Sequence, residues 1–168
     1  NGPSLNDTEL SDRQSPCFRP TPRFWIPREI VQTKLDKYGW DRQWVIVYGR
    51  KVNRNNSRTM SAAVLPLAGA VDTCPTLLLP GENFASRGAY LLGLINSFVF
   101  DYFVRQKLSG FTIGKSHLSL LTVPDLSRVE AGDDQYLLQV DRLLRNCVVE
   151  LSFPSWDALS FVQDCDYD

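Results

Sequence analysis

Cations and side-chain amides are concentrated in one stretch of the sequence, residues 48–66 (YGRKVNRNNSRTMSAAVLP), which contains no acidic residue. Arginine and lysine bind phosphate oxygens, and arginine and asparagine can also form paired hydrogen bonds with guanine and adenine. These residue types, in a segment whose composition favours a turn, raise the hypothesis of contact with a nucleic acid. The candidate DNA-binding residues are Arg50, Lys51, Asn53, Arg54, Asn55, Asn56 and Arg58, with Lys115 as a second contact to the DNA backbone.

These side chains have alternative uses that the sequence leaves open. The cations could simply form a solvated face of the protein. Arg58 and Thr59 could instead cap the strand that follows them or pair with an acid in the core.

The residues needed for catalysis or metal binding do not occur together in the sequence. His117 is the only histidine, and no Asp or Glu is followed two residues later by Lys, as a nuclease site of the paired-acid type requires. The four cysteines are widely spaced, without the close pairs of a zinc site. We therefore predict no catalytic, cofactor-binding or metal-binding residue in this chain. The alternative of a small enzyme would have to use Asp101, His117 or an aspartate of the C-terminal tail.

Charge is distributed unevenly along the chain, although the net charge is only -1. Residues 1–60 hold eleven Lys/Arg and six Asp/Glu, whereas residues 61–168 hold seven and thirteen. A basic region of this kind can face a polyanion while the whole protein stays near neutral. The tail Trp156–Asp168 has four aspartates and no cation, so we expect it on the side away from DNA or against a further domain.

Length and composition predict one globular domain over residues 16–168, after a flexible lead-in at residues 1–15. Residues 16–85 are expected to be rich in strands and basic, and residues 86–168 helical and acidic. The apolar run Ala89–Val104 is shorter than a membrane span. With reduced cysteines and no leader at the N-terminus, the chain is expected to be cytoplasmic and to have no membrane contact.

Hydrophobic patterning predicts an α+β fold. Strand formers dominate residues 42–52, and two apolar segments bounded by proline or glycine follow at 59–71 and 74–80. These segments are expected to form a small antiparallel or mixed sheet in the N-terminal half. The sheet should pack on one long buried helix, Ser86–Ser109, and on a second amphipathic helix, Asp133–Ser152, with a shorter helix at residues 28–39.

Several conspicuous polar and aromatic residues are expected to serve the fold. Asn96 and Ser97 interrupt the apolar helix pattern and are interpreted as polar groups satisfied inside the protein. Trp25, Trp40 and Trp44 alternate with arginines and could stack on an unpaired base. Packing in the core is the favoured interpretation for all three.

The order of four motifs resembles a known family of DNA-modifying proteins. The motifs are WVIVYGR, SRTMSAAVLP, YLLGLINSFVFDYFVRQKLSG and LLTVP, spread over about residues 24–124. In this order they are similar to the C-terminal target-recognition region of type IIG restriction-modification enzymes and related adenine-specific DNA methyltransferases.

The resemblance implies a module that docks on duplex DNA and helps to choose the sequence on which the parent enzyme acts. Asn96-Ser97-Phe98-Val99 does not match the Asn-Pro-Pro-Tyr motif of the methyltransferase, so catalysis would belong to other parts of the parent. The chain begins with Asn1 rather than Met, and a missing methyltransferase or nuclease portion is an expected partner. That portion would use S-adenosylmethionine, and Mg²⁺ if the parent cleaves DNA. The rival prediction is a protein-interaction module that docks on the catalytic domain without reading DNA.

Overall fold

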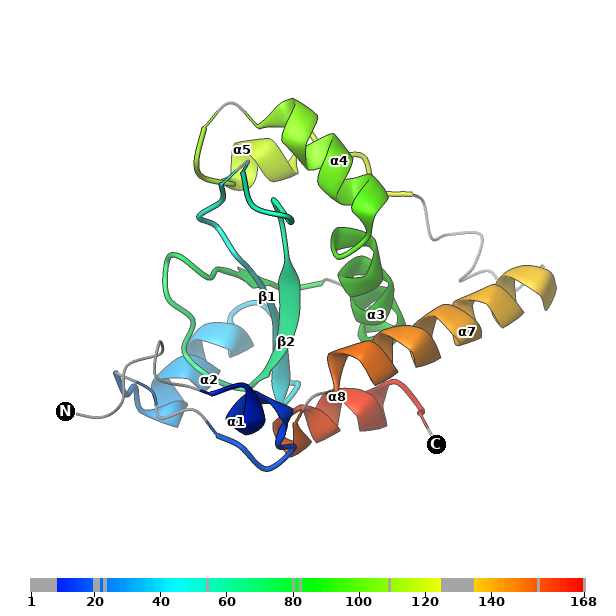
Figure 1. Cartoon of the computed structure of the whole chain (residues 1–168). Helices are drawn as coiled ribbons and strands as arrows, with labels where there is room; N and C mark the ends of the chain where they lie inside the picture. Colours follow the sequence, from blue (N-terminus) through cyan, green and yellow to red (C-terminus); the bar gives the residue numbers. More distant parts are fainter. Residues whose placement is uncertain are drawn as a thin grey trace.

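The computed structural model of the chain (Figure 1) describes residues 9–19, 22, 24–53, 55–79, 81, 83–108, 110–124, 135–153 and 155–167. A small antiparallel sheet packs beside helices, which confirms the predicted α+β class. The elements in chain order are α1 (Leu10–Gln14), α2 (Arg28–Asp36), β1 (Trp44–Tyr48), β2 (Ala62–Pro66), β3 (Thr76–Leu77), α3 (Phe84–Ile95), α4 (Phe98–Lys107), α5 (Lys115–Leu118), α7 (Gln135–Ser152), the 3-10 helix η2 (Trp156–Ala158) and α8 (Leu159–Asp164).

The sheet has three strands in the order β2-β1-β3, with β1 paired antiparallel to both neighbours. Ile46 marks the centre, since it lies opposite Val64 on one side and Leu77 on the other. All five residues of β1 are buried. A continuous run of strand formers without polar alternation is typical of a central strand covered on both faces.

Helix α3 lies between the sheet and α7, and two glycines allow the close approach. A Cβ atom at Gly88 would lie 3.2 Å from Trp44 and 3.3 Å from Ile46 of the sheet. On the other side, a Cβ atom at Gly93 would lie 2.8 Å from Val148 of α7. Figure 1 shows α3 and α7 side by side at this crossing.

The prediction of one helix over Ser86–Ser109 is wrong, because the chain forms two helices with a break at Asn96 and Ser97. The backbone of Ser97 is extended, and its hydroxyl accepts a hydrogen bond from the Phe100 amide at 3.1 Å. Serine at this position competes with a continuous helix, since its side chain caps the start of a new one. Helix α3 also begins earlier than predicted, after Asn83 rather than at Ser86.

The break turns part of the apolar stretch outward, so the prediction that it is buried throughout is also wrong. Phe100 and Val104 of α4 enter the core. Four large side chains on the other side of the same helix are exposed, namely Phe98, Val99, Tyr102 and Phe103.

The larger of two hydrophobic clusters surrounds Trp44, whose ring centroid lies 5.0 Å from that of Trp40 and 4.9 Å from that of Phe161. Core packing is thus confirmed for Trp40 and Trp44, which are 2% and 0% exposed. It is wrong for Trp25, which is 81% exposed. A second cluster, which includes Met60, lies under the segment that follows β1.

The acidic tail folds onto the Trp44 end of β1. The Trp44 indole N–H donates to the carboxylate of Asp164 at 2.7 Å, so a tail aspartate satisfies a buried donor. In the lead-in, residues 1–8 lie outside the described residues and Leu10–Gln14 forms α1. The loop after β1 leaves from the Tyr48 end, and Figure 1 shows α8 and that loop at opposite ends of the strand.

Cysteine reactivity offers a direct check of this packing. Burial raises the pKa of the Cys165 thiol to about 12, whereas Cys17 and Cys147 are exposed. Because the thiolate is the reacting form, iodoacetamide at pH 8 should label Cys17 and Cys147 and leave Cys165 unlabelled until denaturant is added. Peptide mass spectrometry reads out the labels, and rapid native labelling of Cys165 would contradict the packing of α8.

Candidate nucleic-acid interface

One end of the molecule is formed by segments that contain almost no acidic residues. These segments are the loop that follows β1 (residues 49–61), α4 and the segment leading into α5, which lie together in Figure 1. Residues 49–71 contain no Asp or Glu, and residues 83–124 contain only Asp101. We call this end of the molecule the basic end. The Lys and Arg residues described there are Arg50, Lys51, Arg58, Arg105, Lys107 and Lys115.

Asp101, the only acid within residues 49–71 and 83–124, is buried, and its charge is balanced by contacts within the protein. The exposed Asp72 also adjoins this end, through its ion pair with Arg50. Asp101 is 4% exposed. One carboxylate oxygen accepts hydrogen bonds from the Thr59 and Met60 amides at 2.6 and 2.9 Å, and the other accepts from Arg105 Nε at 2.9 Å. Burial by itself would raise the pKa of Asp101, but the hydrogen bonds from Met60, Arg105 and Thr59 outweigh it and lower that pKa. Asp101 therefore adds no exposed negative charge to this surface.

Arg105 extends the same network to the loop. Its terminal nitrogen donates to the carbonyl oxygens of Asn56 and Ser57, both at 2.8 Å. A guanidinium that bonds a carboxylate and two loop carbonyls fixes the loop backbone against α4. Within the loop, Asn53 Oδ1 accepts from the Asn55 amide at 2.9 Å, which forms the turn that its composition predicts.

Thr59 follows the structural alternative raised from the sequence, whereas Arg58 makes a different contact within the fold. The Thr59 amide pairs with the core acid Asp101, as described above. The Arg58 guanidinium donates to the carbonyl oxygen of Asn96 at the end of α3, and its Cζ atom lies 4.7 Å from the centroid of the Phe98 ring. Arg58 is therefore engaged within the fold, which accounts for its half-buried position.

Asn96 and Ser97 are satisfied by contacts within the fold, as predicted, although the Asn96 side chain is exposed. The Asn96 side chain accepts from the Ala62 amide at 3.0 Å and donates to the Ala62 carbonyl at 2.9 Å, so that it pairs with the start of β2. Ser97 caps α4. Both residues connect the helix break to the sheet.

The other residues that the sequence predicts to contact DNA differ in how exposed and how free of internal partners they are. The Arg50 guanidinium forms an ion pair with the exposed Asp72, so part of its charge is balanced within the chain. Arg54 lies outside the described residues. Of the other predicted contacts on the loop, Lys51, Asn53, Asn55 and Asn56 are exposed.

The structure brings Lys115 to the same end as Lys51, although 64 positions separate them in the sequence. Lys51 forms an antiparallel bridge with Thr112, and the Val52 amide donates to the Phe111 carbonyl at 2.9 Å. Lys115 begins α5 three residues after that bridge and is exposed.

Lys107 at the end of α4 is also exposed at this end of the molecule, and it was not among the residues singled out from the sequence. A cation in the last turn of a helix is also favoured by the helix dipole, so its presence there is not specific to a binding surface.

Asp101, His117 and two of the tail aspartates have structural contacts. Asp101 is held as described, and His117 Nδ1 accepts from the Gly114 amide at 3.3 Å. In the tail, Asp157 pairs with Arg19 at 2.9 Å. Across the described part of the chain, no three His, Cys, Asp or Glu side chains gather in a way that could hold a metal ion.

A scan against protein-family models, a search of curated proteins and a search of solved structures each return no match to this chain. The resemblance to target-recognition regions stays a prediction from the sequence motifs. None of the helices in the described ranges combines the length and the apolar character needed to cross a membrane.

Proposed function

We propose that this chain is a DNA-binding domain of the target-recognition type, which contacts duplex DNA through its basic end. The observation that carries the proposal is the Asp101–Arg105 network, which holds the cationic, amide-rich loop in place and keeps the carboxylate of α4 buried. A recognition loop reads a surface best when its backbone is already fixed, because less conformational entropy is lost on binding.

The proposed contacts divide by chemistry. Lys51, Lys107 and Lys115 are exposed cations suited to phosphate oxygens. Asn55 and Asn56 are exposed amides on the loop and are the candidates for adenine edges. Arg58 is withdrawn from this set, since its guanidinium binds the end of α3.

The same proposal includes the longer parent protein to which this chain would belong. The parent protein would be a cytoplasmic restriction-modification enzyme, with S-adenosylmethionine chemistry, and Mg²⁺ if it cleaves, in a portion outside this chain. Docking on that portion is the second candidate function. The observation that favours it is an exposed apolar stripe along α7, formed by Tyr136, Val140, Leu143 and Leu151.

Binding to randomised duplex DNA over a range of salt concentrations, with sequencing of the retained fraction, tests the proposal. We expect log K to fall linearly with log salt, by roughly 0.9 per phosphate contact. An enriched motif would indicate sequence reading by this chain alone, and steep salt dependence without a motif would indicate docking that needs the parent for specificity. Absence of binding even at low salt would refute the proposal and favour the protein-docking candidate.

A further inference from the structure

Helix α4 presents a row of aromatic side chains to solvent directly beside the basic end. Phe98, Tyr102 and Phe103 are 80%, 61% and 56% exposed. Phe98 and Tyr102 lie one helical turn apart on the side opposite to Phe100 and Val104, which enter the core, and Phe103 directly follows Tyr102 in the sequence. Exposed aromatic groups in such a row are typical of a binding surface. We call Phe98, Tyr102 and Phe103 the aromatic row.

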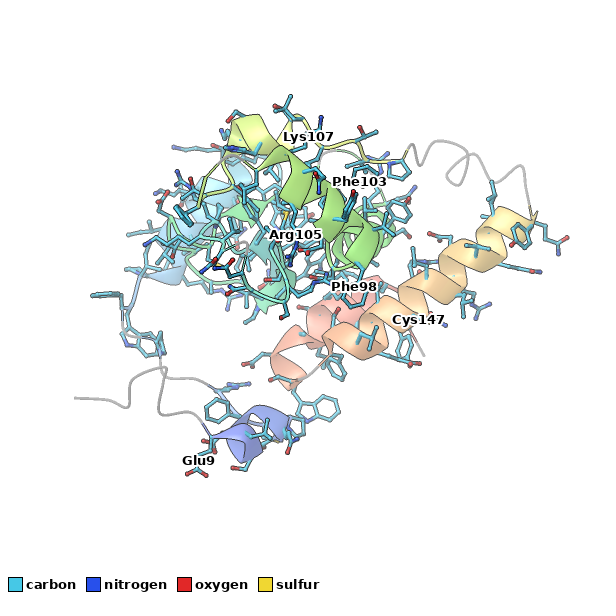
Figure 2. The ribbon with its side chains drawn as sticks, turned by 45° about the horizontal axis from the view of Figure 1, so that its top comes forward. Glu9, Phe98, Phe103, Arg105, Lys107 and Cys147 are labelled. Atoms are coloured by element: carbon cyan, nitrogen blue, oxygen red, sulfur yellow. The ribbon has the colours of Figure 1, made fainter. Side chains whose placement is uncertain are left out.

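Cations border the aromatic row. The Arg58 guanidinium carbon lies 4.7 Å from the Phe98 ring centroid, and Lys107 follows Phe103 at the next turn of the helix. Phe98, Phe103 and Lys107 follow one another along α4 in Figure 2. The Tyr102 and Phe103 rings meet edge to face, with centroids 6.1 Å apart.

The charge around the aromatic row indicates which kind of molecule binds there. The only acid on α4 is the buried Asp101, and the adjoining loop has none, so the exposed charge around the aromatic row is positive. Phosphate is the complementary charge, and flat rings beside cations match a nucleic-acid strand, whose bases stack on aromatic side chains while its phosphates meet lysine and arginine. In an intact duplex the base faces are covered by their neighbours. Only unpaired or extruded bases can use such rings.

We propose that the aromatic row on α4 is a stacking site for unpaired bases of a DNA strand held at the basic end. This inference rests on the proposed function and extends it from duplex docking to recognition of an opened or displaced strand. Lys107 would hold the strand's phosphates while Tyr102 and Phe103 take the bases.

The test measures binding of the whole 168-residue chain to three labelled probes by fluorescence anisotropy. The probes are an oligodeoxythymidine of about 16 nucleotides, an abasic oligomer of the same length and charge, and a blunt duplex. The variant is Tyr102→Ser/Phe103→Ser, and the rescue variant is Tyr102→Phe/Phe103→Tyr. Tyr38→Ser is the matched control, since Tyr38 is 77% exposed and lies just beyond α2, outside the basic end.

We expect the serine variant to lose about tenfold or more in affinity for oligodeoxythymidine, with little change for the abasic oligomer or for the slope of binding against salt. The rescue variant and Tyr38→Ser should bind like the natural chain. Thermal unfolding of each variant separates lost contacts from lost folding.

Other outcomes overturn the inference. An equal loss on the abasic oligomer would mean that the rings act without bases, and unchanged oligodeoxythymidine binding would mean that the aromatic row does not stack on bases. If the serine variant still binds the duplex with its natural affinity in either case, the proposed function remains supported. Base-dependent binding of the single strand without any duplex binding would support the inference and remove the proposed function.

Discussion

Replacing Asp101 with alanine is expected to destabilise the protein by about 2–4 kcal/mol. The substitution removes the acceptor of two buried backbone amides, Thr59 and Met60, and the partner of Arg105. Unsatisfied buried donors lose their hydration without compensation, which makes this deletion more severe than the loss of an exposed ion pair. Urea unfolding followed by tryptophan fluorescence measures the change.

The pH dependence of this effect has a defined sign. Because the pKa of Asp101 is lowered in the folded state, its contribution to stability is present above the unfolded pKa of roughly 4 and is lost as pH falls through the lower native value. The stability difference between the natural chain and Asp101→Ala should therefore shrink in acid. Asp72→Ala serves as the control, since it removes a carboxylate that is 84% exposed, and it should change stability by less than about 1 kcal/mol. An Asp101→Ala variant as stable as the control would show that the loop is not held by this carboxylate.

Reversing two exposed charges of the basic end, in Lys51→Glu/Lys115→Glu, is expected to weaken duplex DNA binding by about 100-fold at moderate salt. Each lysine contributes one phosphate contact in the proposal, so the slope of log K against log salt should fall by about 1 for each. Repulsion of phosphate by the new carboxylates adds to the loss.

A matched variant separates local contact from overall charge. Lys34→Glu/Lys37→Glu makes the same change in net charge on exposed positions of α2 and its C-terminal cap, outside the basic end. We expect this variant to keep nearly the natural affinity and slope. If both double variants lose affinity equally, binding follows the net charge of the protein and the basic end is not the contact surface.

The pattern of residue types along the sequence was sufficient to predict much of the fold. The run Trp44–Tyr48 is β1 as predicted, because its β-branched and aromatic residues favour an extended chain between two covering layers. Gln135–Ser152 is the predicted amphipathic helix, since its apolar residues repeat at helical spacing. Both features depend on neighbours a few residues apart.

The break between α3 and α4 was not predicted, although its residues were noticed. Asn96 and Ser97 were correctly expected to be satisfied by contacts within the fold. Their partners decide whether the helix continues: Asn96 pairs with Ala62, which is 34 residues away, while Ser97 caps the new helix. With the break, Phe98 and Tyr102 turn outward instead of into the core.

The sequence by itself determined the α+β class, the central strand, the long C-terminal helix and the concentration of cations and amides after Tyr48. These follow from composition and from the period of apolar residues, which are local properties of the chain. Only the tertiary structure decided which of those cations remain available. Arg58 meets Asn96 and Arg50 meets Asp72 through contacts between distant segments, while the bridge from Lys51 to Thr112 brings Lys115 to the same end. The physical reason is that a charged side chain binds whichever partner the folded backbone places within reach, and that partner is not encoded in its neighbours along the sequence.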